Sequence, residues 1–222
     1  KTSVMKDIRS IIDEFRAGHH EFEKGHLEGF EGNNPRRLMD EWLADAVEHE
    51  ELEPNAFVLS SVSEDGQPSS RIVYLKDIID DQYVLYTNYL SQKGKEMASN
   101  GKVSMLFFYP KSSRQIRVEG ICKKLDAKTS DKYFASRPRY SKLGAIASAQ
   151  SDPLVSREEL EAKVKELDEQ YGEEIPRPDY WGGYKIKAHR YEFWQGRPSR
   201  LHDRIVFELD ESGNWGIQRI NP

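Results

Sequence analysis

The segment EFWQGRPSRLHDR, residues 192–204, concentrates side chains that could bind an anion. A strand over 200–208 would place Arg200, His202 and Arg204 on one face, because side chains alternate along a strand. Three groups that can each carry positive charge repel one another unless an anion lies beside them. The alternative, a purely structural segment, needs a carboxylate partner for each group. The pattern favours a ligand site on this strand.

A second candidate anion site lies in a helical stretch expected over 127–149 and broken at Pro138. Tyr133 and Arg137 are four residues apart, so a hydroxyl and a guanidinium project from one helix face. Ser141 is placed to cap the helix after the proline, whose N-terminal amides would favour a phosphate. An ordinary polar surface has the same pattern, so the residues alone leave both interpretations open.

Two further cations flank the apolar run SRIVYLK, residues 70–76. Arg71 and Lys76 are five residues apart, which puts them on opposite faces of an ideal strand. They are not expected to bind one phosphate together. Both are solvated strand ends, or they bind two different anions, or one anion across a bulge.

Other kinds of chemistry find little support in the residues. The sequence has no GxGxxG, GxxxxGK[ST], GxSxG, HExxH or paired CxxC motif. His19, His20 and His26 lack carboxylate or thiol ligands at metal spacing, so we expect a histidine-rich loop surface and no metal site. Cys122, the single cysteine, cannot form an intrachain disulfide, which suits a reducing compartment.

The elements that must position these residues begin with a helix. Asn34 can cap it and Pro35 can occupy its first position. An apolar stripe then follows at helical spacing: Leu38, Met39, Trp42, Leu43, Ala46 and Val47.

Short β-type runs come next, at 56–62, 70–76, 83–88, 103–109 and 114–122. The turn EDGQP at 64–68 predicts a hairpin between the first two. A capping box from Ser156 to Glu159 begins a further helix, and strands return at 184–194, 200–208 and 214–219. Because strands and helices do not alternate, the order predicts an α+β protein with a mostly antiparallel sheet or small barrel.

Composition limits the function classes. The chain has 222 residues, 37% hydrophobic and 32% charged, which predicts one folded domain and not a disordered segment. Its net charge of −5 argues against a nucleic-acid module, for which RQIRVEG at 114–120 would be the one basic strand. No apolar run approaches the ~20 residues of a membrane-spanning helix. We expect a cytoplasmic protein, although a removed targeting segment is also compatible with a chain that starts at Lys1.

Six ordered blocks of sequence together resemble the pyridoxamine 5'-phosphate oxidase family over nearly the whole chain. They are RIVYLK, YTN with SQKGKE, RQIRVEG, YFASRPRYSKLGAIASAQSD, PRPDYWGGY and EFWQGRPSRLHDR. The resemblance implies an FMN-binding split β-barrel, mostly antiparallel, with flanking helices. It also implies a homodimer with two FMN sites at the interface, each built from both subunits. We expect a helical extension over 1–50 packed on the barrel, and an oxidase domain over 51–222 that includes C-terminal dimerisation and substrate strands.

The resemblance also assigns roles, block by block. The implied FMN contacts are Arg71, Ile72, Val73, Tyr74, Leu75, Lys76, Tyr86, Thr87, Lys93, Gln115, Gln150, Ser151, Trp194 and Arg204. The implied substrate contacts are Lys76, Tyr133, Arg137, Ser141, Arg200, Leu201 and His202, with Arg200 and His202 as the catalytic candidates. This division agrees with the expectation that Arg71 and Lys76 serve different phosphates.

The chain departs from the family pattern at three places. Gln92 stands where the family often has arginine, which removes one positive charge from the FMN phosphate site. Ile146 stands where many members have tryptophan, a packing change. An Arg-x-x-Tyr lid near the N-terminus is not matched, because Ile12 follows Arg9 at the tyrosine position.

The implied reaction is oxidation of pyridoxamine or pyridoxine 5'-phosphate to pyridoxal 5'-phosphate in vitamin B6 metabolism. A hydride equivalent passes from the substrate to the flavin, dioxygen reoxidises the flavin to give hydrogen peroxide, and the amine loses ammonia. Because the flavin supplies the redox chemistry, the protein must hold the substrate against it. The alternatives are another split-barrel FMN reductase or flavin-binding protein, and a non-catalytic pyridoxal phosphate carrier.

Overall fold

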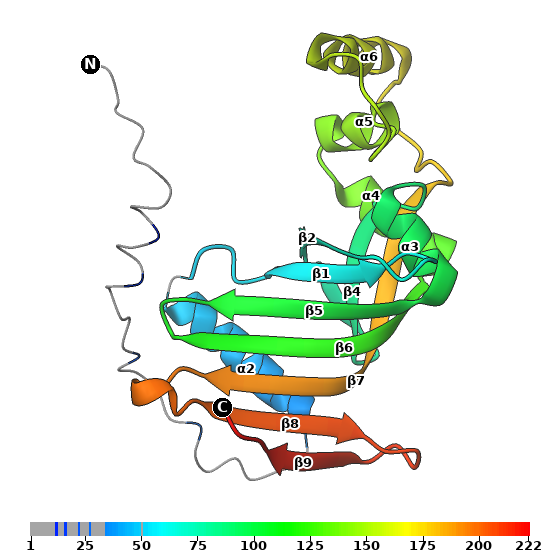
Figure 1. Ribbon diagram of the computed structural model, residues 1–222. Coiled ribbons are helices and arrows are strands. Elements are labelled where there is room, and N and C mark those ends of the chain that lie inside the picture. The colour runs from blue at the N-terminus through cyan, green and yellow to red at the C-terminus, as the bar shows by residue number, and fades with distance from the viewer. Residues whose placement is uncertain (1–11, 13–15, 17–21, 23–26, 28–33, 50) are drawn as a thin grey trace, which may run out of the picture.

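The computed structural model describes residues 12, 16, 22, 27, 34–49 and 51–222, and these build one nine-stranded sheet with flanking helices (Figure 1). The strands are β1 (Ala56–Val62), β2 (Pro68–Tyr74), β3 (Asp77–Ile79), β4 (Gln82–Asn88), β5 (Lys102–Tyr109), β6 (Arg114–Lys124), β7 (Trp181–Gln195), β8 (Asp203–Leu209) and β9 (Trp215–Arg219). The helices are α2 (Pro35–Glu48), α3 (Gln92–Asn100), α4 (Ala127–Ser136), α5 (Arg139–Ala147) and α6 (Arg157–Gln170), with a 3₁₀ turn η1 (Pro198–Arg200). All described strand pairs are antiparallel, which confirms the predicted α+β class.

The long strand β7 divides the sheet into two parts. One edge of β7 pairs with β6 along its length, while the other edge pairs first with β4 and then with β8. The register shifts between Glu119 and Gly120, so His189 of β7 has no partner opposite it. A side chain at position 120 would come within 2.7 Å of the Lys187 carbonyl oxygen, so glycine allows this close approach. Such a bulge increases the local twist of the strand. It lies between the part of β7 that pairs with β4 and the part that pairs with β8.

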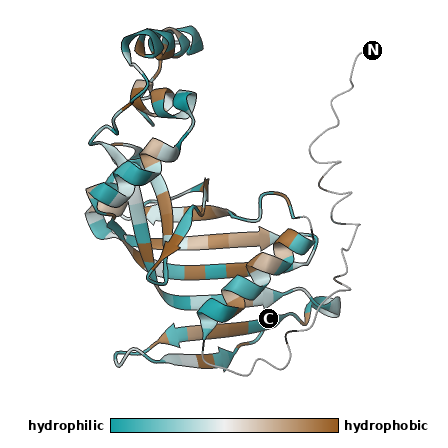
Figure 2. Cartoon of the chain, turned by 180° about the vertical axis from the view of Figure 1, so that it is seen from behind, coloured by the Kyte–Doolittle hydropathy of each residue, from teal (hydrophilic) through white to brown (hydrophobic). Residues whose placement is uncertain are grey.

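Helix α2 covers one face of the sheet (Figure 2). Asn34 caps it by accepting from the Arg36 and Arg37 amides, as predicted. Trp42 packs edge-on against Phe193 of β7 at 5.3 Å between ring centroids, within the main hydrophobic core. Val47, which we expected in the buried stripe, is 62% exposed because it lies on the outer side of the last turn.

Several local signals are confirmed. Gly66 has a φ of 89° in the hairpin that joins β1 to β2. Pro138 separates α4 from α5, and Ser156 caps α6 by accepting from the Glu159 amide at 3.2 Å. None of the helices within the described ranges is long and apolar enough to cross a membrane.

The structure also contains two elements that the sequence pattern did not predict, α3 and β3. Helix α3 is mostly polar and contains Gly94, so it lacks a clear apolar stripe. Its glycine is required by packing, because an added Cβ would lie 2.3 Å from the Tyr89 carbonyl oxygen. Strand β2 ends at Tyr74, so Lys76 lies beyond it and the parity argument for opposite faces does not apply.

Candidate functional site

The first group of candidate residues, here called the α3 cluster, comprises Arg71, Thr87, Lys93, Gln150 and Ser151. It joins the end of β4, the N-terminus of α3 and the loop after α5. The Lys93 ammonium donates to Gln150 Oε1 at 3.0 Å and to Thr87 Oγ1 at 3.4 Å. The Gln92 backbone amide donates to Ser151 Oγ at 3.2 Å. Segments about 60 residues apart in sequence therefore meet at one helix N-terminus, where an anion is favoured.

The arginine of the α3 cluster is held by a buried carboxylate, Glu96. Arg71 Nη2 lies 3.2 Å from Glu96 Oε2, and Glu96 is 5% exposed. Burial by itself raises the pKa of Glu96, but hydrogen bonds from Ser61, Ser69 and Gln92 and the Arg71 charge outweigh it, so the pKa is lowered. The Gln92 side chain donates from Nε2 to Glu96 Oε1 at 2.9 Å. Gln92 therefore adds no positive charge to the α3 cluster.

The electrostatics of the α3 cluster favour a bound anion. Burial lowers the pKa of the Lys93 ammonium, and the nearby Arg71 charge lowers it further. An anion placed between these two cations would reverse the second effect. The α3 cluster therefore fits a phosphate group.

The second group, here called the aromatic cluster, comprises Tyr86, Tyr133, Arg137 and Trp181. The Tyr86 and Tyr133 rings stack at 3.7 Å between centroids, and the Trp181 ring is parallel to both. The Arg137 guanidinium lies 4.6 Å above the Trp181 ring. Its Nη1 atom is buried and has no hydrogen-bond partner among the described residues, so it can still donate to an acceptor from a ligand. Burial lowers the pKa of Arg137, yet an arginine stays charged, so a phosphate fits here as well.

Two local predictions about this region are wrong in detail. Arg137 follows α4 in an extended conformation and is not on its helical face. Ser141 does not cap α5, because the helix begins at Arg139 and the Ser141 amide already donates to the Pro138 carbonyl at 3.0 Å. Ser141 lies instead in the first turn of α5, and Arg137 still interacts electrostatically with Tyr133.

The predicted strand over 200–208 is also wrong at its start. Pro198–Arg200 forms the η1 turn, with φ of 55° at Ser199 and 61° at Arg200, and β8 begins at Asp203. Proline fixes its own φ and starts a turn, so alternation from Arg200 to Arg204 does not hold. Arg200 and Leu201 are exposed on this turn.

His202 lies in an aromatic setting rather than beside two arginines on one face. Its ring centroid is 4.6 Å from Trp194 and 5.4 Å from Phe22. Burial lowers the pKa of His202, and the Arg200 charge contributes, so the neutral form is favoured near neutral pH. The Arg197 backbone amide donates to Nδ1 at 3.1 Å, which leaves the proton of the neutral ring on Nε2.

The third group, here called the C-terminal row, comprises Gln115, Trp194 and Arg204. The strand register places them side by side across β6, β7 and β8. Arg204 donates to Glu192 from Nε at 2.9 Å and from Nη2 at 2.7 Å. A purely structural role for the cations of this segment requires a carboxylate partner for each, and for Arg204 that partner is Glu192.

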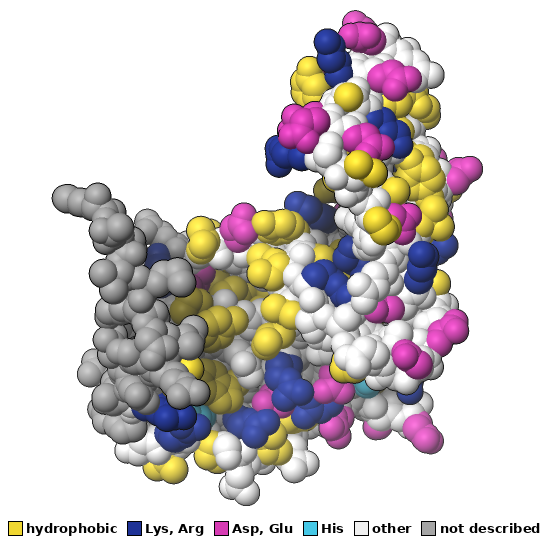
Figure 3. All heavy atoms as spheres, turned by 45° about the horizontal axis from the view of Figure 1, so that its top comes forward, with side chains coloured by type: hydrophobic (Ala, Val, Ile, Leu, Met, Phe, Trp, Pro, Cys, Tyr) yellow, Lys and Arg dark blue, Asp and Glu magenta, His cyan; other side chains and the backbone are white. Residues whose placement is uncertain are grey.

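The remaining residues of the RIVYLK block divide between the two faces of the sheet. Val73 packs against the core and Leu75 is buried, whereas Ile72 and Tyr74 are exposed. Lys76 is exposed, with its ammonium 4.8 Å above the Tyr74 ring. Figure 3 shows hydrophobic side chains together with groups of Lys and Arg side chains on the face turned toward the viewer.

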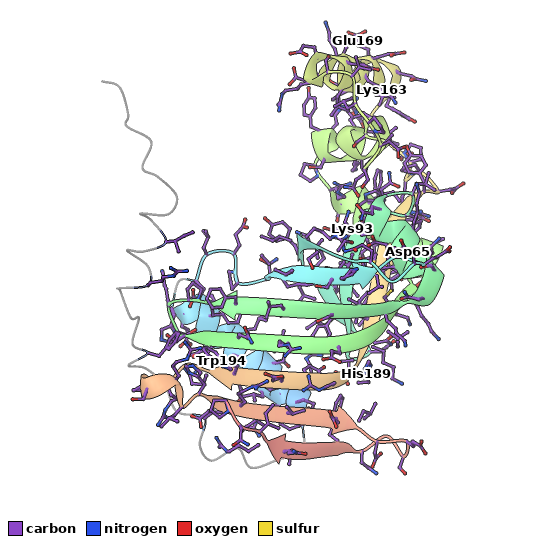
Figure 4. All side chains as sticks on the ribbon, viewed as in Figure 1. Asp65, Lys93, Lys163, Glu169, His189 and Trp194 are labelled. Atoms are coloured by element: carbon purple, nitrogen blue, oxygen red, sulfur yellow. The ribbon has the colours of Figure 1, made fainter. Side chains whose placement is uncertain are left out.

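The α3 cluster and the C-terminal row do not share one pocket in the part of the chain that the structure describes. Lys93 bonds to Thr87, which pairs with Gly182 at the start of β7, whereas Trp194 lies near the end of that strand. Figure 4 shows the two residues well apart. Within the described ranges no cluster of three or more His, Cys, Asp or Glu side chains could hold a metal ion. His19, His20, His26 and Arg9 lie outside the described residues.

Glu96, Glu192 and Trp181 are the site residues that the sequence did not indicate. Each contacts a candidate arginine that is distant in sequence. Glu96 contacts Arg71, Glu192 contacts Arg204, and Trp181 contacts Arg137. Glu96 lies in a polar segment and Glu192 is a single charge between Tyr191 and Phe193, so neither local sequence indicated an arginine partner. For Glu192, alternation along β7 would have been a signal. Tyr191 and Phe193 face the core, so Glu192 faces the other side of the sheet, as Trp194 does.

Comparison with known proteins relates the whole chain to one family. Residues 43–171 match the family model Pyridoxamine 5'-phosphate oxidase, and residues 181–222 match Pyridoxine 5'-phosphate oxidase C-terminal dimerisation region. A pyridoxine/pyridoxamine 5'-phosphate oxidase of Leptospira biflexa is 50% identical over 216 residues, 97% of this chain and 95% of the relative. One of Bordetella pertussis is 48% identical over 202 residues, 90% of this chain and 96% of the relative.

A solved structure agrees with this relationship. PhzG from Burkholderia lata, in complex with tetrahydrophenazine-1-carboxylic acid, is 31% identical and superimposes with a TM-score of 0.85. The match covers 91% of this chain and 100% of PhzG. The chain belongs to the pyridoxamine 5'-phosphate oxidase family and has the split β-barrel fold predicted from its sequence blocks.

Proposed function

We propose that this protein uses FMN and dioxygen to oxidise pyridoxamine or pyridoxine 5'-phosphate to pyridoxal 5'-phosphate, with release of hydrogen peroxide and, from the amine, ammonia. The observation that carries the proposal is the aromatic cluster, where the buried Nη1 atom of Arg137 lies beside Tyr133 and has no partner in the described part of the chain. It is a second place for a phosphate, separate from the α3 cluster. A protein that bound only the flavin would not need both.

In this proposal each group of residues has one task. The α3 cluster binds the FMN phosphate, and the C-terminal row contacts the flavin ring. Arg137, Tyr133, Ser141 and Lys76 bind the substrate phosphate. The flavin, when bound, accepts two electrons and a proton from the substrate. Neutral His202 offers its Nε2–H to the substrate from a ring held by Trp194, and Arg200 adds a positive charge beside it.

We further propose that two copies of the chain complete each site. The α3 cluster lies beside Gly182, and Trp194 is near the other end of β7, roughly 40 Å further along the strand at ~3.3 Å per residue. One FMN molecule does not span that length. A homodimer in which the α3 cluster of one subunit faces the C-terminal row of the other resolves this separation. The match of 181–222 to a dimerisation region supports it. The division into an extension over 1–50 and an oxidase domain over 51–222 remains part of the proposal.

The test is spectroscopic. Purified protein titrated with FMN is expected to bind about one flavin per chain, since each chain supplies one α3 cluster and one C-terminal row. Anaerobic mixing with pyridoxamine 5'-phosphate is expected to bleach the flavin absorbance, and air should restore it. Protein that binds pyridoxal phosphate but no FMN would be a carrier. FMN that is bleached by a nicotinamide donor but not by the vitamer phosphates would indicate a reductase.

Two neighbouring arginines should have separable effects. Arg200→Ala is expected to lower kcat/KM by roughly 10- to 100-fold with FMN still bound, because a charge-assisted hydrogen bond contributes ~1.5–3 kcal/mol. Arg204→Ala should weaken FMN binding instead, and excess FMN should restore part of the activity. Titration of both variants with FMN and with pyridoxamine 5'-phosphate checks this. Loss of FMN from Arg200→Ala, with only substrate affinity lost in Arg204→Ala, would reverse the two assignments.

A further inference from the structure

Glu192 is a buried carboxylate surrounded by arginines. It lies on β7 and is 1% exposed. Its Oε1 atom accepts from Arg204 of β8, at 2.7 and 2.9 Å. Its Oε2 atom accepts from Arg117 of β6 at 3.1 Å and from Arg190 of β7 at 3.4 Å. Three adjacent strands therefore each contribute a guanidinium to one carboxylate.

The burial of Glu192 does not come from the hydrophobic core. The neighbouring residues Tyr191 and Phe193 belong to the core beneath α2, so alternation directs Glu192 to the opposite face. Arg117, Arg190 and Arg204 contact it there. A carboxylate removed from water in this way is strongly destabilising unless its partners stay in place.

The register relates Glu192 to the C-terminal row. Gln115, Trp194 and Arg204 form one row, and Arg117, Glu192 and Val206 form the next row on the same face. Glu192 thus lies beside the proposed flavin-contacting residues without being one of them. Arg204 reaches diagonally from its own row to the Glu192 carboxylate.

We propose that Glu192 is a positioning residue for Arg204, an inference that rests on the proposed role of Arg204 in FMN binding. Arg204 has five N–H donors. Its Nε and Nη2 atoms donate to Glu192, and Nη1 donates to the Asn221 carbonyl at 3.0 Å. One N–H on Nη1 and one on Nη2 are left to donate to a ligand. The contact with Glu192 fixes the directions in which these two N–H groups point. Glu192, together with Glu119 and Glu208, offsets the charges of the three surrounding arginines. The C-terminal row therefore recognises FMN through hydrogen-bond geometry and not through excess positive charge.

A double-mutant cycle on FMN affinity tests this role. The full-length variants are Glu192→Gln, Arg204→Gln and the double variant, each measured by quenching of FMN fluorescence on binding. Glu192→Gln is expected to raise the FMN Kd roughly 10-fold, because the amide cannot hold the guanidinium as a carboxylate does. In the Arg204→Gln background the same change should have no further effect on the FMN Kd. A merely structural role would not produce this coupling.

Glu208→Gln is the matched control, because Glu208 accepts from Arg190 in the same network and does not contact Arg204. It should leave the FMN Kd unchanged. If Glu192→Gln does not fold, Glu192→Asp keeps the charge on a shorter side chain and should show the same coupling. An unchanged Kd in the Glu192 variant, or additive losses in the double variant, would overturn the inference. Failure of the unmodified protein to bind FMN would instead reject the proposed function.

Discussion

Replacing Arg137 by alanine is expected to lower kcat/KM for pyridoxamine 5'-phosphate by roughly 100- to 1,000-fold while FMN binding stays unchanged. A guanidinium that binds a phosphate through two charge-assisted hydrogen bonds contributes ~3–4 kcal/mol. Arg137 is positioned for this, since it lies on the Trp181 ring and its buried Nη1 atom has no acceptor within the described ranges. Steady-state kinetics and FMN titration of the same preparation provide the measurement.

The apoprotein Tm of the Arg137→Ala variant distinguishes a lost phosphate contact from a general loss of stability. The variant loses the packing of Arg137 on Trp181, but it also removes a buried donor that has no partner among the described residues. These two effects oppose each other, so the apoprotein Tm should change little. The control is Lys132→Ala, which removes an exposed charge from α4 next to Tyr133. An equal loss of kcat/KM in this control would point to a general electrostatic effect. Loss of FMN from Arg137→Ala would contradict the division between the two phosphate sites.

Arg71→Ala is expected to raise the FMN Kd by roughly 100-fold or more and to destabilise the protein by about 3 kcal/mol. The two effects have different causes. The first is the loss of a cation from the α3 cluster. The second arises because Glu96 stays buried after it loses its charged partner, although Ser61 and Ser69 still donate to it. Urea unfolding of the apoprotein and FMN titration measure the two effects separately.

A double variant separates the two roles of Arg71. Arg71→Gln with Glu96→Gln removes both charges, so no unpaired carboxylate remains buried and much of the lost stability should return. FMN affinity should not return, because the phosphate has still lost its arginine. Recovery of FMN binding in the double variant would show that Arg71 acts only by neutralising Glu96.

Local sequence signals predicted the elements that are determined by local chemistry. The cap at Asn34 and the apolar stripe that follows it specified α2, because these interactions lie within a few turns of one helix. The EDGQP turn specified the β1–β2 hairpin, and Pro138 specified the break between α4 and α5. The same local rules misplaced the start of β8, because alternation was assumed to continue through the turn at Pro198.

The order of sequence blocks determined the family, the split-barrel fold and the candidate residues, but not how those residues are arranged. Only the tertiary structure showed that Arg71 binds Glu96, that Arg204 binds Glu192 and that Arg137 lies on Trp181. These partners are far apart in sequence, or on neighbouring strands whose register depends on the bulge at His189. The charge that an arginine offers to a ligand depends on its nearest carboxylate, which local periodicity does not encode.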